Sequence, residues 1–194
     1  EVAARIANND DIKIVALAGP SASGKTTTAH ILCEKLKALG KETEIISLDD
    51  FYLPVDELPI LEDGTRDIES VNALDIPLIN KCFGEIITTG KTILPKFNFS
   101  EKKRISEARE IDVSGRSIAI VEGLHALNPL ITDLVPRKNI FKAYISVNCG
   151  IENEDGTKLL SSKKIRLVRR VLRDRTFRGT SVNQTLLLWQ GVVE

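Results

Sequence analysis

The sequence contains no methionine and few aromatic residues, which make up 5% of the chain. Its three cysteines, Cys33, Cys82 and Cys149, stand far apart and form no C-x-x-C pair, which argues against a disulfide framework and a zinc site. No apolar run reaches the roughly 18 residues needed to span a bilayer, and the first residues lack a signal-peptide pattern. We therefore expect a soluble, cytoplasmic protein with reduced thiols and no membrane partner.

An excess of either charge is also missing, since 27 basic residues balance 27 acidic ones. A neutral chain is a poor candidate for sequence-independent nucleic-acid binding, so we expect no nucleic-acid partner. The 194 residues, 42% of them hydrophobic, suffice for one domain with a sizeable core. Because the chain lacks an initiator methionine and opens inside a predicted helix at 2–8, either it is a piece of a longer polypeptide or methionines are missing from the sequence as given.

Short apolar strands alternate with helices along the chain. The patterns predict strands at 12–18, 44–48, 117–121 and 140–147, and helices at 25–39, 71–89, 158–178 and 182–190. Residues 53–66 are predicted to form a loop, and the extended pieces 92–97 and 105–111 a hairpin-like excursion. This order predicts an α/β fold with a mainly parallel sheet flanked by helices, within a single domain over 1–194. Ligands of such sheets bind beyond the carboxyl ends of the strands.

A glycine-rich turn follows the first predicted strand. Residues 19–26 read Gly-Pro-Ser-Ala-Ser-Gly-Lys-Thr and fit the pattern G-x-x-x-x-G-K-[ST]. In this pattern backbone N–H groups surround phosphate oxygens, Lys25 reaches the β- and γ-phosphates, and the Thr26 hydroxyl binds Mg²⁺. A glycine turn that merely packs a helix on a sheet would not need Lys25 and Thr26. The motif predicts a P-loop NTPase fold that binds ATP through Gly19, Ser21, Ala22, Ser23, Gly24, Lys25, Thr26 and Thr27.

Carboxylates end two of the predicted strands. Asp49 and Asp50 follow the strand at 44–48, and Glu122 follows the strand at 117–121. A kinase needs a carboxylate near the accepting hydroxyl, and we assign this role to Asp49, with Asp50 as a structural residue. Glu122 ends a buried strand, where an unpaired carboxylate is costly unless it is solvated or bound. We predict that Mg²⁺ is held by Thr26, Asp49 and Glu122, directly or through water.

The segment 158–178 is rich in lysine and arginine and is opposed only by Asp174. Arginines on a mobile helix can close over ATP and stabilise charge on a transferring phosphoryl group. A solvated helix face and a nucleic-acid-binding helix are the alternatives. We interpret residues from about 152 to 180 as a helical lid over the nucleotide.

With these pieces in place, the chain resembles the uridine kinase/phosphoribulokinase family. The resemblance covers roughly residues 10 to 190 and rests on GPSASGKTT at 19–27, SLDDFY at 47–52, RDIESVNALD at 66–75, LPKFNF at 94–99, IVEGLHALNP at 120–129 and RLVRRVLRDRTFRG at 166–179. It is most similar to a bacterial branch in which the kinase-like domain follows domains similar to the N-terminal part of threonyl-tRNA synthetase.

The resemblance implies roles for individual residues. Asp49 matches the general base, and Glu69 matches an acid that binds sugar hydroxyls. Arg169 and Arg173 match lid arginines that act on the phosphoryl group, Arg170 one that contacts the nucleotide and Arg166 one on the substrate side. Tyr52, Phe97 and Lys102 match acceptor positions. Two of these depart from the family, which has tyrosine in place of Phe97 and histidine in place of Lys102. The chain also stops at Glu194, before the family's final strand and helix.

The function these observations predict is ATP- and Mg²⁺-dependent phosphoryl transfer to a hydroxyl of a uridine- or cytidine-like nucleoside or a similar small molecule. A catalytically weak nucleotide-binding sensor is the alternative that the changes at Phe97 and Lys102 keep open. A GTPase would need an N-K-x-D motif, but Asn80-Lys81 is followed by Cys82-Phe83. An RNA-binding role for the basic helix is disfavoured by the neutral charge and the lack of interleaved aromatics. Assembly into a homo-oligomer is left open.

Overall fold

The computed structural model describes residues 1–99, 101–147 and 150–193, with side chains in the last helix as far as Trp189. Cys149 therefore lies outside the described residues, whereas Cys33 and Cys82 are free thiols. No helix in these ranges combines the length and the apolarity needed to cross a bilayer.

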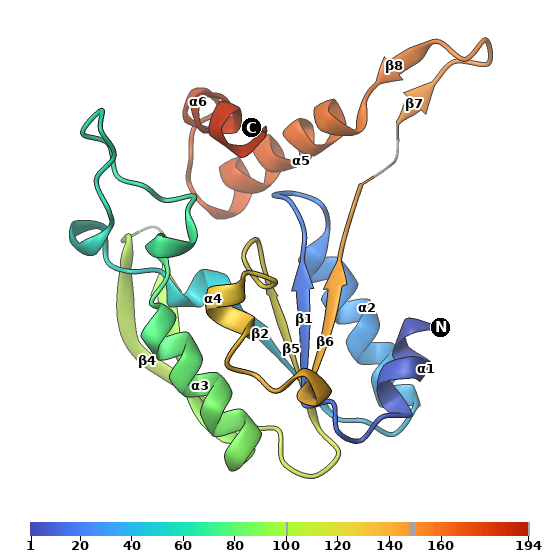
Figure 1. Ribbon diagram of the computed structural model, residues 1–194. Coiled ribbons are helices and arrows are strands. Elements are labelled where there is room, and N and C mark those ends of the chain that lie inside the picture. The colour runs from blue at the N-terminus through green and yellow to red at the C-terminus, as the bar shows by residue number, and fades with distance from the viewer. Residues whose placement is uncertain (100, 148–149, 194) are drawn as a thin grey trace.

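A parallel four-stranded sheet forms the centre of the molecule (Figure 1). Its strands are β1 (Ile14–Ala18), β2 (Thr43–Ser47), β5 (Ile118–Gly123) and β6 (Ile140–Tyr144), in the order β2-β5-β1-β6. The register pairs Ser47 with Glu122 and Ala18 with Gly123, so these strands end at one edge of the sheet. The predicted strands and their parallel arrangement are confirmed.

Helices cover both faces of this sheet because its strands are apolar on both sides. On one face, Val15 and Leu17 pack with α1 (Val2–Ala7) and α2 (Lys25–Ala38). On the other face, Ala16 packs with α3 (Ile76–Thr88) and α4 (Pro129–Thr132). Alternate residues of one strand thus serve two cores, as expected of a buried parallel strand.

The helix predicted from residue 71 begins later. Val71–Ala73 form a short 3₁₀ turn, Leu74 pairs with Tyr52 in an isolated β-bridge, and α3 starts at Ile76. The side chain of Asp75 caps it by accepting the backbone N–H of Leu78 at 3.0 Å. A helix running through 71–77 would place a proline in its interior, where the ring clashes with the preceding turn, so Pro77 is tolerated only at the helix start.

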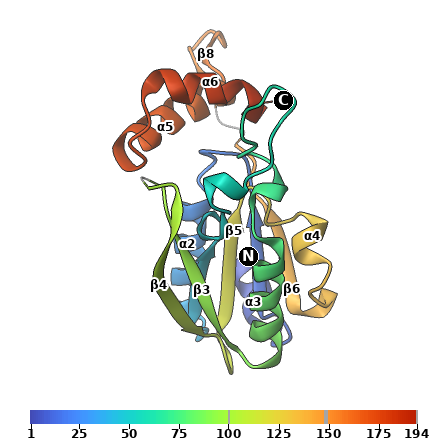
Figure 2. The same cartoon turned by 90° about the vertical axis from the view of Figure 1, so that its left-hand side faces the viewer.

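An antiparallel hairpin of β3 (Lys91–Asn98) and β4 (Lys103–Asp112) flanks the sheet, which confirms the predicted excursion (Figure 2). It lies beside β2, since Arg109 donates to the backbone carbonyl of Ile45 at 2.6 Å. Short 3₁₀ turns occur at η1 (Leu48–Phe51), η2 (Val55–Glu57) and η4 (Arg137–Asn139).

The segment predicted as a lid, about 152–180, contains most of the small hairpin of β7 (Ile151–Glu152) and β8 (Lys158–Leu160) and all of α5 (Ser162–Phe177), and it is followed by α6 (Val182–Val193). It lies above the carboxyl ends of the sheet strands (Figure 1). The basic helix was expected from Lys158, but residues 158–160 pair with β7, and Ser161 caps α5 by accepting the Lys164 N–H at 3.4 Å. A serine side chain that satisfies a free N–H group fixes the helix start.

Candidate functional site

The phosphate-binding loop connects β1 to α2. Gly24 has φ 100° and Ala22 has φ 59°, so the chain turns through the left-handed region twice within three residues. A Cβ on Gly19 would lie 2.8 Å from the backbone oxygen of Ile145 and 2.9 Å from Ser23 Oγ. Only glycine fits there. The buried Ser23 hydroxyl has no hydrogen-bond partner among the described residues, which leaves it able to meet a ligand oxygen in the loop.

Lys25 and Thr26 are the first two residues of α2. Lys25 Nζ donates to the Pro20 backbone oxygen at 3.2 Å, and burial lowers the pKa of this lysine while the charges of Glu122 and Asp49 oppose the shift. A half-buried cation at a helix N-terminus is a favourable partner for phosphate oxygens. The loop, its helix and the lysine therefore form the cationic site that the motif predicts.

Glu122 ends β5 and is 8% exposed. Its Oε1 accepts the Thr26 hydroxyl at 3.0 Å and the Ser47 hydroxyl at 3.4 Å. Burial and the charge of Asp49 raise the pKa of Glu122. A buried carboxylate beside a hydroxyl is a set of hard oxygen donors, which fits Mg²⁺ held together with nucleotide phosphates. Thr26 and Glu122 would hold that ion, and Asp49, whose charge acts on Glu122, lines the same cavity.

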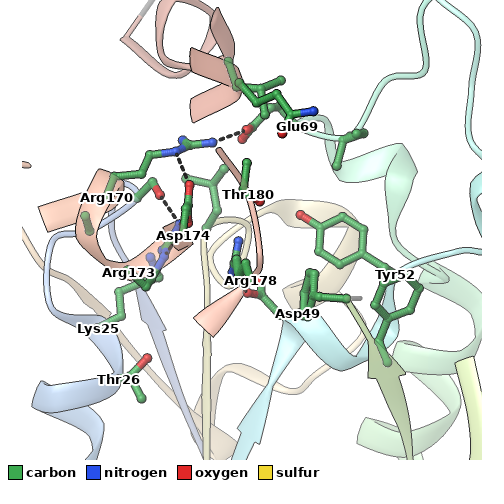
Figure 3. A pocket seen from close by; sticks show the side chains of 18 of the residues that line it. Lys25, Thr26, Asp49, Tyr52, Glu69, Arg170, Arg173, Asp174, Arg178 and Thr180 are labelled. Carbon is green, nitrogen blue, oxygen red and sulfur yellow. Dashed lines mark hydrogen bonds and ion pairs between the residues drawn. The ribbon is translucent and has the colours of Figure 1, made fainter. Parts of the chain in front are cut away.

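Asp49 lies in the 3₁₀ turn that ends β2. The turn is capped by Ser47 Oγ, which accepts the Asp49 N–H at 3.3 Å. Asp49 Oδ2 accepts from Arg178 Nη2 at 2.7 Å, and Figure 3 labels both residues. The Arg178 guanidinium also lies over the ring of Phe99, 4.6 Å from its centroid. The predicted base is thus paired with an arginine from the end of α5. Sequence reasoning placed Arg178 in the lid but gave it no partner.

Asp50, by contrast, faces the hairpin. Its Oδ1 accepts the backbone N–H of Phe97 at 3.3 Å, and burial raises the pKa of its carboxyl group. The two neighbouring aspartates therefore have different surroundings. Asp50 fixes the position of β3, whereas Asp49 faces the cavity.

The arginines of α5 contact two different parts of the site, the phosphate-binding loop and Glu69. Arg166 Nε donates to the Ser21 backbone oxygen at 3.1 Å, and Arg173 Nη2 lies 3.5 Å from Ser21 Oγ. Arg169 Nη2 lies 3.4 Å from the point where Gly24 would carry a Cβ. These three arginines adjoin the phosphate-binding loop.

Arg166 and Arg170 exchange the places predicted for them. Arg166, expected on the substrate side, contacts the phosphate-binding loop, and Arg170, expected at the nucleotide, donates from Nη2 to Glu69 Oε1 at 3.1 Å. The two residues are four apart on one helix face, so the tilt of α5 over the sheet decides which end each one meets. That tilt is set by tertiary packing and is not encoded in the helical spacing.

Asp174 joins these arginines and is 4% exposed (Figure 3). Its Oδ1 accepts two bonds from Arg173, from Nε at 2.9 Å and Nη2 at 2.7 Å, and its Oδ2 lies 3.4 Å from Arg170 Nε. Thr185 of α6 donates to Oδ2 at 3.4 Å. One buried carboxylate thus orients an arginine at each end of the cavity. Asp174 is the only acidic residue in the basic segment 158–178, and this feature of the sequence could have indicated its role.

Three aromatic rings line the cavity that Asp49 also faces. Tyr52, Phe97 and Phe99 form a mutual cluster with centroid separations of 5.2 to 6.1 Å, and burial raises the pKa of Tyr52. Lys102 lies exposed at the hairpin turn with φ 52°. The backbone oxygen of Glu69 lies 2.8 Å from Nε2 of His125, which holds the segment carrying this acid against β5.

Most of these groups border one cavity of about 990 Å³. Of the residues predicted for the site, fifteen line it, namely Ser21, Ala22, Gly24, Lys25, Thr26, Thr27, Asp49, Tyr52, Glu69, Phe97, Lys102, Glu122, Arg169, Arg170 and Arg173. The remaining three, Gly19, Ser23 and Arg166, pack behind the loop or against it. The cavity also receives Phe99, Asp174 and Arg178, together with side chains of α6, which sequence reasoning did not assign to the site.

Comparison with known proteins supports this interpretation. The family model described as "Phosphoribulokinase / Uridine kinase family" matches residues 14–193. A uridine kinase of Saccharomyces cerevisiae is 27% identical over 188 residues, which cover 93% of this chain and 32% of that protein. A uridine kinase of Ligilactobacillus salivarius is 26% identical over 182 residues, covering 93% of this chain and 75% of that protein. The chain thus spans about a third of the yeast protein's length.

A solved structure shares the fold at lower identity. The D-glycerate 3-kinase from Cryptococcus neoformans var. grubii aligns with a TM-score of 0.60 at 15% identity, covering 93% of this chain and 77% of that one. Together with the parallel sheet and the phosphate-binding loop, this likeness confirms the predicted α/β fold class.

Proposed function

Because the chain belongs to the phosphoribulokinase/uridine kinase family, we propose that it transfers the γ-phosphate of Mg-ATP to a hydroxyl group of a small molecule. The observation that carries this proposal is the convergence of the phosphate-binding loop, the Asp49 carboxylate and the lid arginines on one cavity. Phosphoryl transfer needs little covalent chemistry from a protein and depends mainly on positioning and on electrostatic stabilisation. The cavity supplies both.

Each end of the cavity has its own task in this proposal. The loop N–H groups and Lys25 hold the phosphates, while Arg169 and Arg173 stabilise the charge that spreads over the transferring group. Thr26 and Glu122 would hold Mg²⁺, which would neutralise charge at the phosphates. Asp49 accepts the proton of the acceptor hydroxyl. For this step its hydrogen bond to Arg178 has to break, or Asp49 has to bond Arg178 and the hydroxyl at the same time.

A nucleoside is the starting proposal for the acceptor, since the matched relatives are uridine kinases. Glu69 offers a carboxylate to sugar hydroxyls. The side that would read a base is weaker, because Phe97 has no hydroxyl and Lys102 is a flexible donor without an acceptor. We therefore expect weak or broad nucleoside selectivity, or an anionic acceptor that Lys102 meets. The presence of a base candidate, a metal site and phosphate-binding groups in one cavity favours turnover over a sensor without catalysis.

The test of this proposal is a transfer assay with radiolabelled ATP and a panel of uridine, cytidine, purine nucleosides and simple polyols. The variant Lys25→Ala should lower kcat/KM by roughly 10²–10³-fold, because it deletes a charge that faces the phosphates. The matched control Lys35→Ala removes an exposed lysine from the other end of α2 and should leave turnover unchanged. Full activity in Lys25→Ala would refute the assignment of the nucleotide site.

A further inference from the structure

Beyond Asp49 the cavity has an apolar wall made by two separate segments. Leu53, Val55, Leu58 and Ile68 come from the segment between β2 and α3, and Leu187 and Leu188 come from α6. Both segments stand above the carboxyl ends of the strands, on the lid side of the molecule (Figures 1 and 2). The wall therefore continues the phosphoryl-transfer site and is not a separate surface.

Several of these side chains are left in water. Ile68 is 45% exposed, Leu188 43% and Leu187 78%. Covering apolar surface gains roughly 25 cal/mol for each Å² removed from water, so a ligand with an apolar surface would be stabilised here. The three aromatic rings of Tyr52, Phe97 and Phe99 add further apolar surface to the same cavity.

Polar groups that could read a nucleobase are few along this wall. Lys102, Thr180 and Gln184 line it, but Gln184 Oε1 already accepts the Ser181 N–H and hydroxyl, both at 3.2 Å. The two carboxylates nearby, Asp49 and Glu69, are bonded to Arg178 and Arg170. A pyrimidine placed against the wall would leave polar edges unpaired, which costs affinity and discrimination.

We propose that the acceptor is an alcohol with a largely apolar body, in which the reactive hydroxyl lies at Asp49 and an alkyl or aryl group packs against Ile68, Leu187 and Leu188. The inference rests on the proposed function for the place of the hydroxyl, and it narrows the substrate class of the same site. Because the wall shares its cavity with Asp49 and Glu122, its occupant has to be small enough to share about 990 Å³ with the nucleotide.

The experiment compares two ligands that carry the same ribose hydroxyls, uridine and 1-phenyl-β-D-riboside. Their dissociation constants are measured by calorimetry in the presence of Mg²⁺ and a non-hydrolysable ATP analogue. We expect the phenyl riboside to bind about tenfold more tightly, the scale set by a few methylene groups in an apolar pocket. Leu188→Gln should abolish this preference. Leu134→Gln, which changes a leucine that is 74% exposed outside the cavity, should retain it.

Each outcome decides a separate question. Equal binding of the two ribosides, tighter binding of uridine, or failure of both to bind would overturn the apolar acceptor. Tighter binding of the phenyl riboside without phosphate transfer to it would uphold the apolar pocket and count against the proposed function. Light scattering on the same samples tests whether a second copy of the chain covers the wall instead. If Leu188→Gln converts a dimer into a monomer and leaves both affinities unchanged, the wall is a subunit interface and the proposal fails.

Discussion

The two ends of the cavity are built in different ways. The nucleotide end is built on one continuous stretch, residues 19–27, with Glu122 added from the neighbouring strand and Arg169 and Arg173 from α5. The acceptor end is assembled from four segments that are far apart in sequence, namely 49–69, 97–102, 170–180 and 184–188. A contiguous motif fixes its own geometry through local backbone conformation. A site gathered from four segments depends on how helices and loops pack.

Their charges differ in the same way. At the nucleotide end, Lys25 and Arg169 face the cavity beside a helix N-terminus, ready for phosphate. At the acceptor end, the two carboxylates are already paired, Asp49 with Arg178 at 2.7 Å and Glu69 with Arg170 at 3.1 Å. An anionic ligand can therefore enter the first end directly. We therefore expect an acceptor at the second end to displace these ion pairs, which would couple its binding to the position of α5.

The largest effect is expected from the predicted base. Asp49→Asn should lower kcat by about 10³-fold while the affinity for ATP is kept, because the loss is confined to proton transfer from the hydroxyl. Asp50→Asn is the matched control, since an asparagine oxygen can still accept the Phe97 N–H and turnover should change little. Transfer assays and ATP titrations of both variants separate the two residues. If Asp50→Asn is the more damaging change, the base has been assigned to the wrong aspartate.

A smaller effect, shared by both ends, is expected from Asp174. Its carboxylate orients Arg173 at the phosphate-binding loop and Arg170 at Glu69. Asp174→Asn should therefore weaken binding of both the ATP analogue and the acceptor, by about tenfold each. Asp155→Asn, at the exposed turn of the lid hairpin, serves as the control. Loss at one end alone would show that the two arginines are positioned independently of each other.

The nucleotide end could be predicted almost completely from the sequence. The loop glycines, Lys25 and Thr26 have fixed spacing, and their conformations follow from steric limits that any such loop obeys. The position of Glu122 beside the loop also follows from the sequence, because strands of a parallel sheet bring their carboxyl ends to one edge. The fold class, the four parallel strands and the hairpin followed from the same periodic patterns.

The acceptor end could be predicted only as a set of candidates. Helical spacing places Arg166 and Arg170 on one face but does not say which one meets the phosphate-binding loop, since that depends on the orientation of α5. The pairing of Arg178 with Asp49 joins residues 129 apart in sequence. The contribution of Leu187 and Leu188 depends on the fold of α6 over the cavity. Such contacts are decided by tertiary packing, which leaves no local signature in the sequence.

A smaller effect is expected on hydrogen exchange, which compares the responses of the two ends of the cavity to their ligands. The like charges of α5 repel one another until phosphates arrive, so exchange in residues 162–177 should slow when an ATP analogue binds. An acceptor alone should slow exchange mainly in residues 53–70. Mass spectrometry of both complexes makes the measurement, with the α3 helix as an internal reference. Equal exchange in α5 with and without nucleotide would count against a mobile lid.

The smallest effect on either end is expected from an ion pair that is remote from both. Lys41 is 2% exposed, and its Nζ lies 2.5 Å from Asp10 Oδ1, just beyond the end of the helix that begins at Lys25. The hydrogen bond from Lys41 holds the pKa of Asp10 below 3.8, with smaller contributions from Lys41, Arg116 and Lys13 charges. Near that pH the folded state binds fewer protons than the unfolded state. The stabilisation is therefore present above pH 3.8 and is lost as the pH falls through the lowered pKa of the folded state.

Asp10→Asn should lower the Tm at neutral pH, and the difference should shrink below pH 3.8, while kcat and both affinities stay unchanged at assay temperature. A Tm difference that persists into acid would exclude the Asp10 charge as its cause. A selective loss of ATP affinity would show that this end of α2 is linked to the phosphate-binding loop.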